Sequence, residues 1–148
     1  MTAELHICTG CKDRDRDRRR AGRGGGPALL AAVAAEVARR LPEAGIEVVA
    51  HECLGACPRR GRASLAGPGR WSWLFAGLDA ERDVPVLCEF VARWLAAPQG
   101  LVDKAHRGAT LRPKILGRVP PPQAARPELA APAARIDPST HTRGEKRP

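Results

Sequence analysis

The amino-acid sequence predicts an α/β fold in which two helices cover one small sheet. Two apolar stripes at helical spacing predict the helices, and short β-branched or alternating runs predict the strands. The expected order of elements is β-α-β-β-β-α, within a domain that spans residues 3–97. Residues 98–120 are expected to form an extended strap. The Pro- and Ala-rich residues 121–148 are expected to form an irregular, disordered tail.

The first half of the domain is expected to be a strand, a loop, a helix and a second strand. Residues 5–7 are the first strand candidate, and Cys8 follows it directly. Residues 12–26 are basic and Gly-rich without a large apolar residue, which is typical of a mobile, solvated linker. Apolar residues at helical spacing predict a helix over residues 27–41, with a proline in its first turn. The β-branched run at residues 46–50 predicts the second strand.

The second half is expected to be a hairpin followed by a helix. The arms are residues 63–66 and 70–76, and the turn between them is Gly-Pro-Gly. In the second arm Trp71, Trp73 and Phe75 share one face by the two-residue period. Asp83 is expected to be the N-cap of the last helix, whose apolar stripe includes Cys88.

Composition narrows the classes of protein that the chain can belong to. The 148 residues suffice for one domain, and a hydrophobic share of 43% is normal for a globular protein. The net charge is +9, but Arg outnumbers Lys 21 to 4, which reflects GC-rich codons. The few aromatic residues fall in core patterns, so we expect no nucleic-acid partner. The longest uncharged apolar run, residues 28–35, is too short for a membrane span, and without an export signal we expect a cytoplasmic protein.

Four of the five cysteines form two close pairs, each directly after a predicted strand. Cys8 and Cys11 have C-x2-C spacing, and Cys53 and Cys57 have C-x3-C spacing. If the two strands are parallel neighbours joined by a crossover helix, both pairs meet at one edge of the sheet. Four converging thiolates can bind zinc or an iron–sulfur cluster. Gly10 and Gly55 fit tight ligand loops, whose backbone N–H groups can face sulfur.

Other residues near the cysteines have plainer interpretations. Cys88 lies on an apolar helical stripe, so we interpret it as a buried free thiol and not as a ligand. His6 alternates with Cys8 and is a candidate second-sphere donor, but we favour reading His6 and His51 as ordinary polar residues beside the site. The basic run that follows the second pair, residues 59–62, is expected to lie close to a site of net negative charge.

The segment Glu52–Cys57 resembles the second cluster loop of thioredoxin-like 2Fe–2S ferredoxins, a group that includes the small cluster subunit of respiratory NADH dehydrogenases. A closer resemblance, over about residues 5–122, is to an uncharacterised bacterial family of small predicted metal-binding proteins often encoded near cobalamin-synthesis genes. The matching segments are CTGC (residues 8–11), CLGAC (53–57), GPGRWSWLFAGL (67–78) and RVPP (118–121). The resemblance implies a thioredoxin-like fold, a metal-binding function and a link to cobalamin or metal metabolism.

Two departures from these families bear on the ligand set. Thioredoxin-like ferredoxins usually separate their first two cysteines by more than two residues, so the C-x2-C spacing leaves the type of cluster open. Many relatives carry a further cysteine shortly after the second pair, where this chain has Gly61. The ligand set that remains is Cys8, Cys11, Cys53 and Cys57.

Three functions follow from these patterns. The leading prediction is a 2Fe–2S ferredoxin-like electron carrier, not an enzyme, whose partner is a redox or metal-metabolism protein. The second is a zinc-binding or metal-trafficking protein with the same four ligands. The third is a thiol–disulfide oxidoreductase, disfavoured because the helix starts far along the chain from Cys8 and Cys11 and so is not expected to activate them. We expect no membrane partner, and we keep a homodimer as an alternative assembly.

Overall fold

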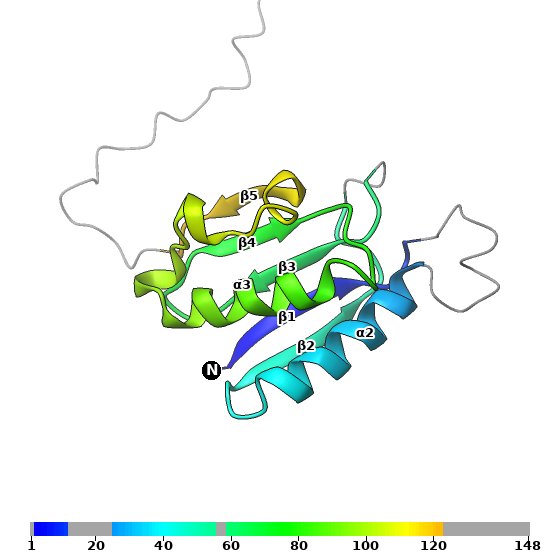
Figure 1. The fold of residues 1–148 in the computed structure, drawn as a ribbon, viewed down its shortest axis with the longest axis horizontal. Coiled ribbons are helices and arrows are strands. Elements are labelled where there is room, and N and C mark those ends of the chain that lie inside the picture. The colour runs from blue at the N-terminus through cyan, green and yellow to red at the C-terminus, as the bar shows by residue number, and fades with distance from the viewer. Residues whose placement is uncertain (1, 12–24, 56–58, 123–148) are drawn as a thin grey trace, which may run out of the picture.

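The computed structural model describes residues 2–11, 25–55 and 59–122 and has a mixed α/β architecture (Figure 1). One five-stranded sheet has the strand order β2-β1-β3-β4-β5. The elements in chain order are β1 (Ala3–Cys8), α2 (Gly25–Arg40), β2 (Ile46–His51), β3 (Ala63–Ala66), β4 (Ser72–Phe75), α3 (Val84–Ala96), the 3-10 turns η1 (Pro98–Gly100), η2 (Lys104–His106) and η3 (Arg112–Lys114), and β5 (Ile115–Val119).

The unit β1-α2-β2 has the crossover topology that the sequence predicts. β1 and β2 are parallel neighbours, and Cys8 at the end of β1 is opposite His51 at the end of β2. Both strands therefore end at the same edge of the sheet, where α2 also begins (Figure 1). The helix begins at Gly25 and not at Pro27, so two glycines expected in the preceding linker belong to it.

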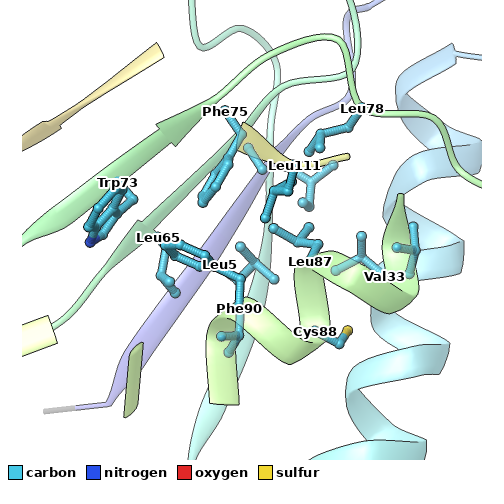
Figure 2. Packing of buried hydrophobic residues seen from close by; sticks show 14 of the residues in the cluster. Leu5, Val33, Leu65, Trp73, Phe75, Leu78, Leu87, Cys88, Phe90 and Leu111 are labelled. Carbon is cyan, nitrogen blue, oxygen red and sulfur yellow. The ribbon is translucent and has the colours of Figure 1, made fainter. Parts of the chain in front are cut away.

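The core lies between the sheet and the two helices. Trp73 and Phe75 of β4 are each 1% exposed, and both meet Phe90 of α3 edge to face, with ring centroids 5.1 and 5.3 Å apart (Figure 2). Leu5 of β1 and Val33 of α2 are buried in the same cluster, so one core joins all of these elements. Trp71 was expected on the same face as Trp73 and Phe75. It lies just before β4 and is half-buried, so only Trp73 and Phe75 are fully part of the core.

The region after α3 contains a strand that the sequence analysis did not predict. β5 pairs antiparallel with β4, so the expected strap over residues 98–120 adds a fifth strand to the sheet. The Trp73 indole N–H donates to the Gly100 carbonyl, at 2.8 Å, and this bond holds the start of the region against the core. β5 escaped prediction because a glycine and a proline-rich flank weaken its strand pattern. The tail expected over residues 121–148 lies, beyond Pro122, outside the described residues.

Asp83 occupies the N-cap position of α3, as predicted, but its side chain does not cap the helix. The carboxylate instead accepts the backbone N–H of Asp79, at 2.6 Å, and forms an ion pair with Lys114. Asp83 is 3% exposed, so this buried carboxylate joins the start of α3 to the segment that leads into β5. Within the described ranges, neither helix has the length and apolar character needed to cross a bilayer.

Candidate metal centre

Backbone hydrogen bonds join the loops that follow β1 and β2. The N–H of Thr9 donates to the carbonyl of His51, at 2.7 Å, and the N–H of Gly10 donates to the carbonyl of Glu52, at 2.9 Å. The hydrogen bonding between β1 and β2 thus continues past the ends of the strands. The loop that carries Cys8 and Cys11 is therefore fixed beside the loop that carries Cys53.

Two glycines allow this close approach. A Cβ atom on Gly10 would lie 2.3 Å from the carbonyl oxygen of Glu52, and a Cβ atom on Gly26 would lie 2.3 Å from that of Cys8. The N–H of Gly26 also donates to the Cys11 carbonyl, at 2.8 Å. The start of α2 therefore lies against the Cys8–Cys11 loop despite the long sequence separation, a contact that the sequence analysis did not predict.

The first cysteine pair is assembled in the structure. The Sγ atoms of Cys8 and Cys11 are 3.4 Å apart, and both thiols are free. Two sulfurs bound to one tetrahedral metal at about 2.3 Å are about 3.8 Å apart. The pair is therefore close to the spacing that a shared metal requires. Cys8 is buried and Cys11 is half-buried, so one side of the pair is shielded from water.

The two cysteine loops together lower the pKa of Cys8. Burial by itself raises the pKa of a thiol, but hydrogen bonds from the N–H of Leu54, from the Cys11 thiol and from the N–H groups of Gly10 and Cys11 outweigh burial here. The net effect is a pKa of Cys8 below its ordinary value. The donor at Leu54 comes from the second cysteine loop, so both loops stabilise negative charge on the same sulfur.

Cys11 has the opposite balance in the free thiol form. Burial and the neighbouring Cys8 raise the pKa of Cys11, while the N–H of Gly61 and the positive charge of Arg62 act to lower it. Two thiols this close share one proton more easily than they lose both, so the first ionises and the second resists. A bound cation removes this resistance, because it replaces the shared proton.

The second cysteine pair is described only in part. Cys53 is exposed, and its Sγ accepts the N–H of Gly55, at 3.3 Å, from a backbone with φ +78°. This confirms that Gly55 supplies both an unusual backbone conformation and an N–H group aimed at sulfur. Cys57 lies outside the described residues. Within the described ranges, no three Cys, His, Asp or Glu side chains are close enough together to hold a metal ion.

The two histidines beside the site bond to each other. His6 Nδ1 lies 2.7 Å from His51 Nε2, and His6 Nε2 lies 3.0 Å from a carboxylate oxygen of Glu4. Both ring nitrogens of His6 therefore have partners other than Cys8. This agrees with the interpretation of His6 and His51 as polar neighbours, and it gives no support to His6 as a donor to Cys8.

Arg62 is the residue at this site whose importance the sequence analysis did not single out. It is 2% exposed, and its backbone carbonyl accepts the N–H of Cys8, at 3.1 Å. Its Nη1 is buried and has no hydrogen-bond partner among the described residues. The basic run at residues 59–62 predicts a cation near the site, but a sequence pattern cannot tell which arginine is buried. Arg59, for comparison, is exposed and its Nη2 donates to the Pro113 carbonyl, at 3.3 Å.

Cys88 is a buried free thiol, as predicted. It is 1% exposed and lies on α3 in the core between the helices (Figure 2). Burial, followed by the nearby charge of Glu36, raises the pKa of Cys88 to about 11. A thiol in this position is a small apolar core residue and a poor ligand.

The five-stranded sheet and its two helices, with a cysteine pair at one edge of the sheet, have a thioredoxin-like fold. A thioredoxin-like [2Fe–2S] ferredoxin from Aquifex aeolicus is similar over 82% of this chain and 97% of its own, with a TM-score of 0.50 and 14% identity. At that identity the likeness shows the shared fold alone. The chain belongs to the family described as a protein of unknown function, DUF1636, whose model matches residues 5–121. No curated protein is significantly similar to it. Membership of an uncharacterised family is thus confirmed, while the metal binding and the cobalamin link expected of that family stay predictions.

Proposed function

We propose that this protein is a small iron–sulfur electron carrier in which Cys8, Cys11, Cys53 and Cys57 hold a 2Fe–2S cluster. The observation that carries the proposal is the Cys8–Cys11 pair, with sulfurs 3.4 Å apart, fixed beside the Cys53 loop. The described part of the chain contributes three of the four proposed ligands. The fourth, Cys57, follows Cys53 by four residues.

The surroundings of the sulfurs fit an anionic group. N–H groups of both loops lower the pKa of Cys8, the N–H of Gly55 donates to the Cys53 sulfur, and the buried Arg62 accepts the Cys8 N–H through its backbone carbonyl. Four thiolates around an oxidised 2Fe–2S core or a Zn²⁺ ion leave a net charge of about −2. Preorganised N–H groups stabilise that charge without the cost of reorienting water. When bound, a 2Fe–2S cluster supplies one-electron redox chemistry, and hydrogen bonds to its sulfurs tune the potential.

The role that we infer is a carrier and not a catalyst. Cys8 is shielded from water, while Cys53 is exposed, so a centre at this edge would be accessible from one side. Accessibility from one side suits short-range electron exchange with a docked protein. The proposal includes a redox or metal-metabolism protein as the partner, a cytoplasmic location, and the link to cobalamin or metal metabolism that the resemblance implies.

Metal analysis with an absorption spectrum tests this proposal. The full chain is purified without oxygen, and iron, acid-labile sulfide and zinc are measured per chain. We expect a brown protein with two iron and two sulfide per chain and visible bands that bleach on reduction. A colourless protein that holds one zinc per chain would overturn the iron–sulfur proposal and support the four-thiolate zinc site instead.

A thiol–disulfide oxidoreductase is a second candidate because Cys8 and Cys11 are close and the pKa of Cys8 is lowered. Against it, Cys8 is 2% exposed, whereas an attacking thiolate must reach an external disulfide. The test is reduction of a small disulfide substrate by metal-free protein. This candidate would be favoured over the carrier by two results together: metal-free wild type reduces the substrate and metal-free Cys11→Ser does not, while Cys11→Ser as purified holds as much metal as wild type.

A further inference from the structure

The buried guanidinium of Arg62 lacks the partner that such a group normally has. Its Nε and Nη2 both donate to one neutral acceptor, the Arg59 carbonyl, at 2.6 and 2.5 Å. Its Nη1 has no acceptor among the residues that the structure describes, and no carboxylate in those ranges lies within ion-pair distance of it. A buried cation is costly unless an anion or a hydrogen-bond acceptor compensates it.

The backbone around Arg62 is held in place, so the side chain cannot swing to solvent with its loop. The carbonyl of Gly61 accepts the N–H of Leu78, at 2.9 Å, and the carbonyl of Arg62 accepts the N–H of Cys8. Gly61 has φ +63°, and a Cβ there would lie 2.0 Å from the Leu78 carbonyl oxygen. Close backbone contacts therefore fix the segment that delivers Arg62.

The cysteine pair lies beside the segment that carries Arg62, because the Arg62 carbonyl accepts the N–H of Cys8, at 3.1 Å. The positive charge of Arg62 acts to lower the pKa of the neighbouring Cys11, which burial raises. The sequence from residue 53 to residue 78 contains no Asp or Glu. Neutral thiols do not balance a guanidinium, whereas thiolates around a metal centre would carry the opposite charge.

We propose that Arg62 is the buried counter-charge of the cysteine site, with Nη1 donating to a sulfur of the bound metal centre. This rests on the proposed four-cysteine site and concerns a positioning residue, not a ligand. One positive charge offsets part of the charge of about −2 that four thiolates leave on the centre. Reduction adds one more negative charge, so Arg62 stabilises the reduced form more than the oxidised form.

The first test uses metal affinity of the metal-free full chain. Co²⁺ and Zn²⁺ are the probes, and sulfur-to-cobalt charge-transfer absorption reports thiolate coordination. We expect Arg62→Gln to weaken binding at least tenfold and Arg62→Lys, which keeps the charge, to weaken it less. Arg70→Gln is the matched control, because Arg70 also donates to backbone carbonyls, those of Trp94 and Ala97, at 2.8 and 3.2 Å.

Thermal unfolding separates an electrostatic role from a merely structural one. A residue that only supports the fold lowers Tm equally with and without metal. We expect the rise in Tm on adding Zn²⁺ to be smaller in Arg62→Gln than in wild type and Arg70→Gln, while the metal-free Tm changes little. If Arg62→Gln does not fold, the same comparison is made with Arg62→Met, which also removes the charge.

The reduction potential of the iron–sulfur form is the third readout. We expect Arg62→Gln to lower the potential, and a tenfold loss of preference for the reduced form corresponds to about 59 mV. If wild type binds metal through sulfur and Arg62→Gln has the same metal affinity, Tm rise and potential, the role of Arg62 is overturned and the proposed function is not. A wild type that binds neither Co²⁺ nor a cluster would overturn the proposed function as well.

Discussion

Gly10 and Glu52 approach so closely that no other residue fits at position 10 without movement. The N–H of Gly10 donates to the Glu52 carbonyl, at 2.9 Å, and an added Cβ would lie 2.3 Å from that oxygen. Their bond joins the two cysteine loops. Substitution of Gly10 therefore tests whether the alignment of these loops produces the metal site.

We expect Gly10→Ala to push the loops apart, to cost about 1–3 kcal/mol of stability and to weaken metal retention. Urea unfolding and metal content measure the two effects. Gly117→Ala in β5 is the control, because a Cβ there meets no atom within 4 Å. A Gly10→Ala protein as stable and as metal-loaded as Gly117→Ala would show that the close approach is not needed.

The ligand set is tested by Ser substitution. We expect Cys53→Ser, and equally Cys57→Ser, to abolish cofactor retention and to destabilise the metal-bound fold, because a neutral hydroxyl does not replace a thiolate. Iron, sulfide and zinc per chain are measured after oxygen-free purification. Full metal content in Cys53→Ser would remove that residue from the set.

Cys88→Ala is the matched cysteine variant. Because Cys88 is 1% exposed in the core, we expect intact cofactor content and a stability loss of about 1–2 kcal/mol from the cavity. Chemical unfolding at pH 7 and metal analysis are the measurements. Loss of the metal in this variant would show that the ligand assignment is wrong.

Stability at alkaline pH should depend on Cys88. The pKa of Cys88 is raised from 9.0 to about 11, so the folded state keeps a proton that the unfolded chain has already released. The contribution is fully present below pH 9 and is lost as the pH rises toward 11. Over that range we expect wild type to lose roughly 2–3 kcal/mol more than Cys88→Ala. If the free energy of unfolding, measured in urea, falls equally with pH in the two proteins, the raised pKa of Cys88 is contradicted.

We expect the effects of substituting Asp83 and Lys114 on stability to be strongly coupled. Asp83 is 3% exposed, so Lys114→Met would leave its charge buried without a cation. We expect this variant to lose about 3–5 kcal/mol, and Asp83→Asn combined with Lys114→Met to recover part of the loss. A double-mutant cycle by urea unfolding measures the coupling. Additive effects would mean that the pair does not support the start of α3.

Most helices and strands were predictable because their signals are local. The β-branched run of β2, the apolar stripes of α2 and α3, and the hairpin glycines each give a periodicity that a short window contains. The parallel pairing of β1 and β2 followed from the crossover helix between them. β5 was missed because its pairing with β4 comes from packing against the sheet, and its own residues barely alternate.

The candidate site was predictable in its residues but only partly in its geometry. Cysteine spacing and the strands before each pair placed Cys8 and Cys11 beside Cys53, and the structure confirms that the two loops adjoin. The contact between the start of α2 and the Cys8–Cys11 loop was not predicted. A long intervening loop can bring the start of a helix back beside an earlier segment, so the distance along the sequence does not give the distance in space.

The amino-acid sequence by itself determined the β-α-β order, the two cysteine pairs and the burial of Cys88, because composition and period decide these over short windows. Only the tertiary structure decided that Gly26 meets the Cys8–Cys11 loop, that Nη1 of Arg62 is buried without a partner among the described residues, and that Asp83 bonds to Lys114. These are contacts between distant segments. Their identity depends on which atoms the folded backbone brings within a few ångströms, and no local pattern encodes that.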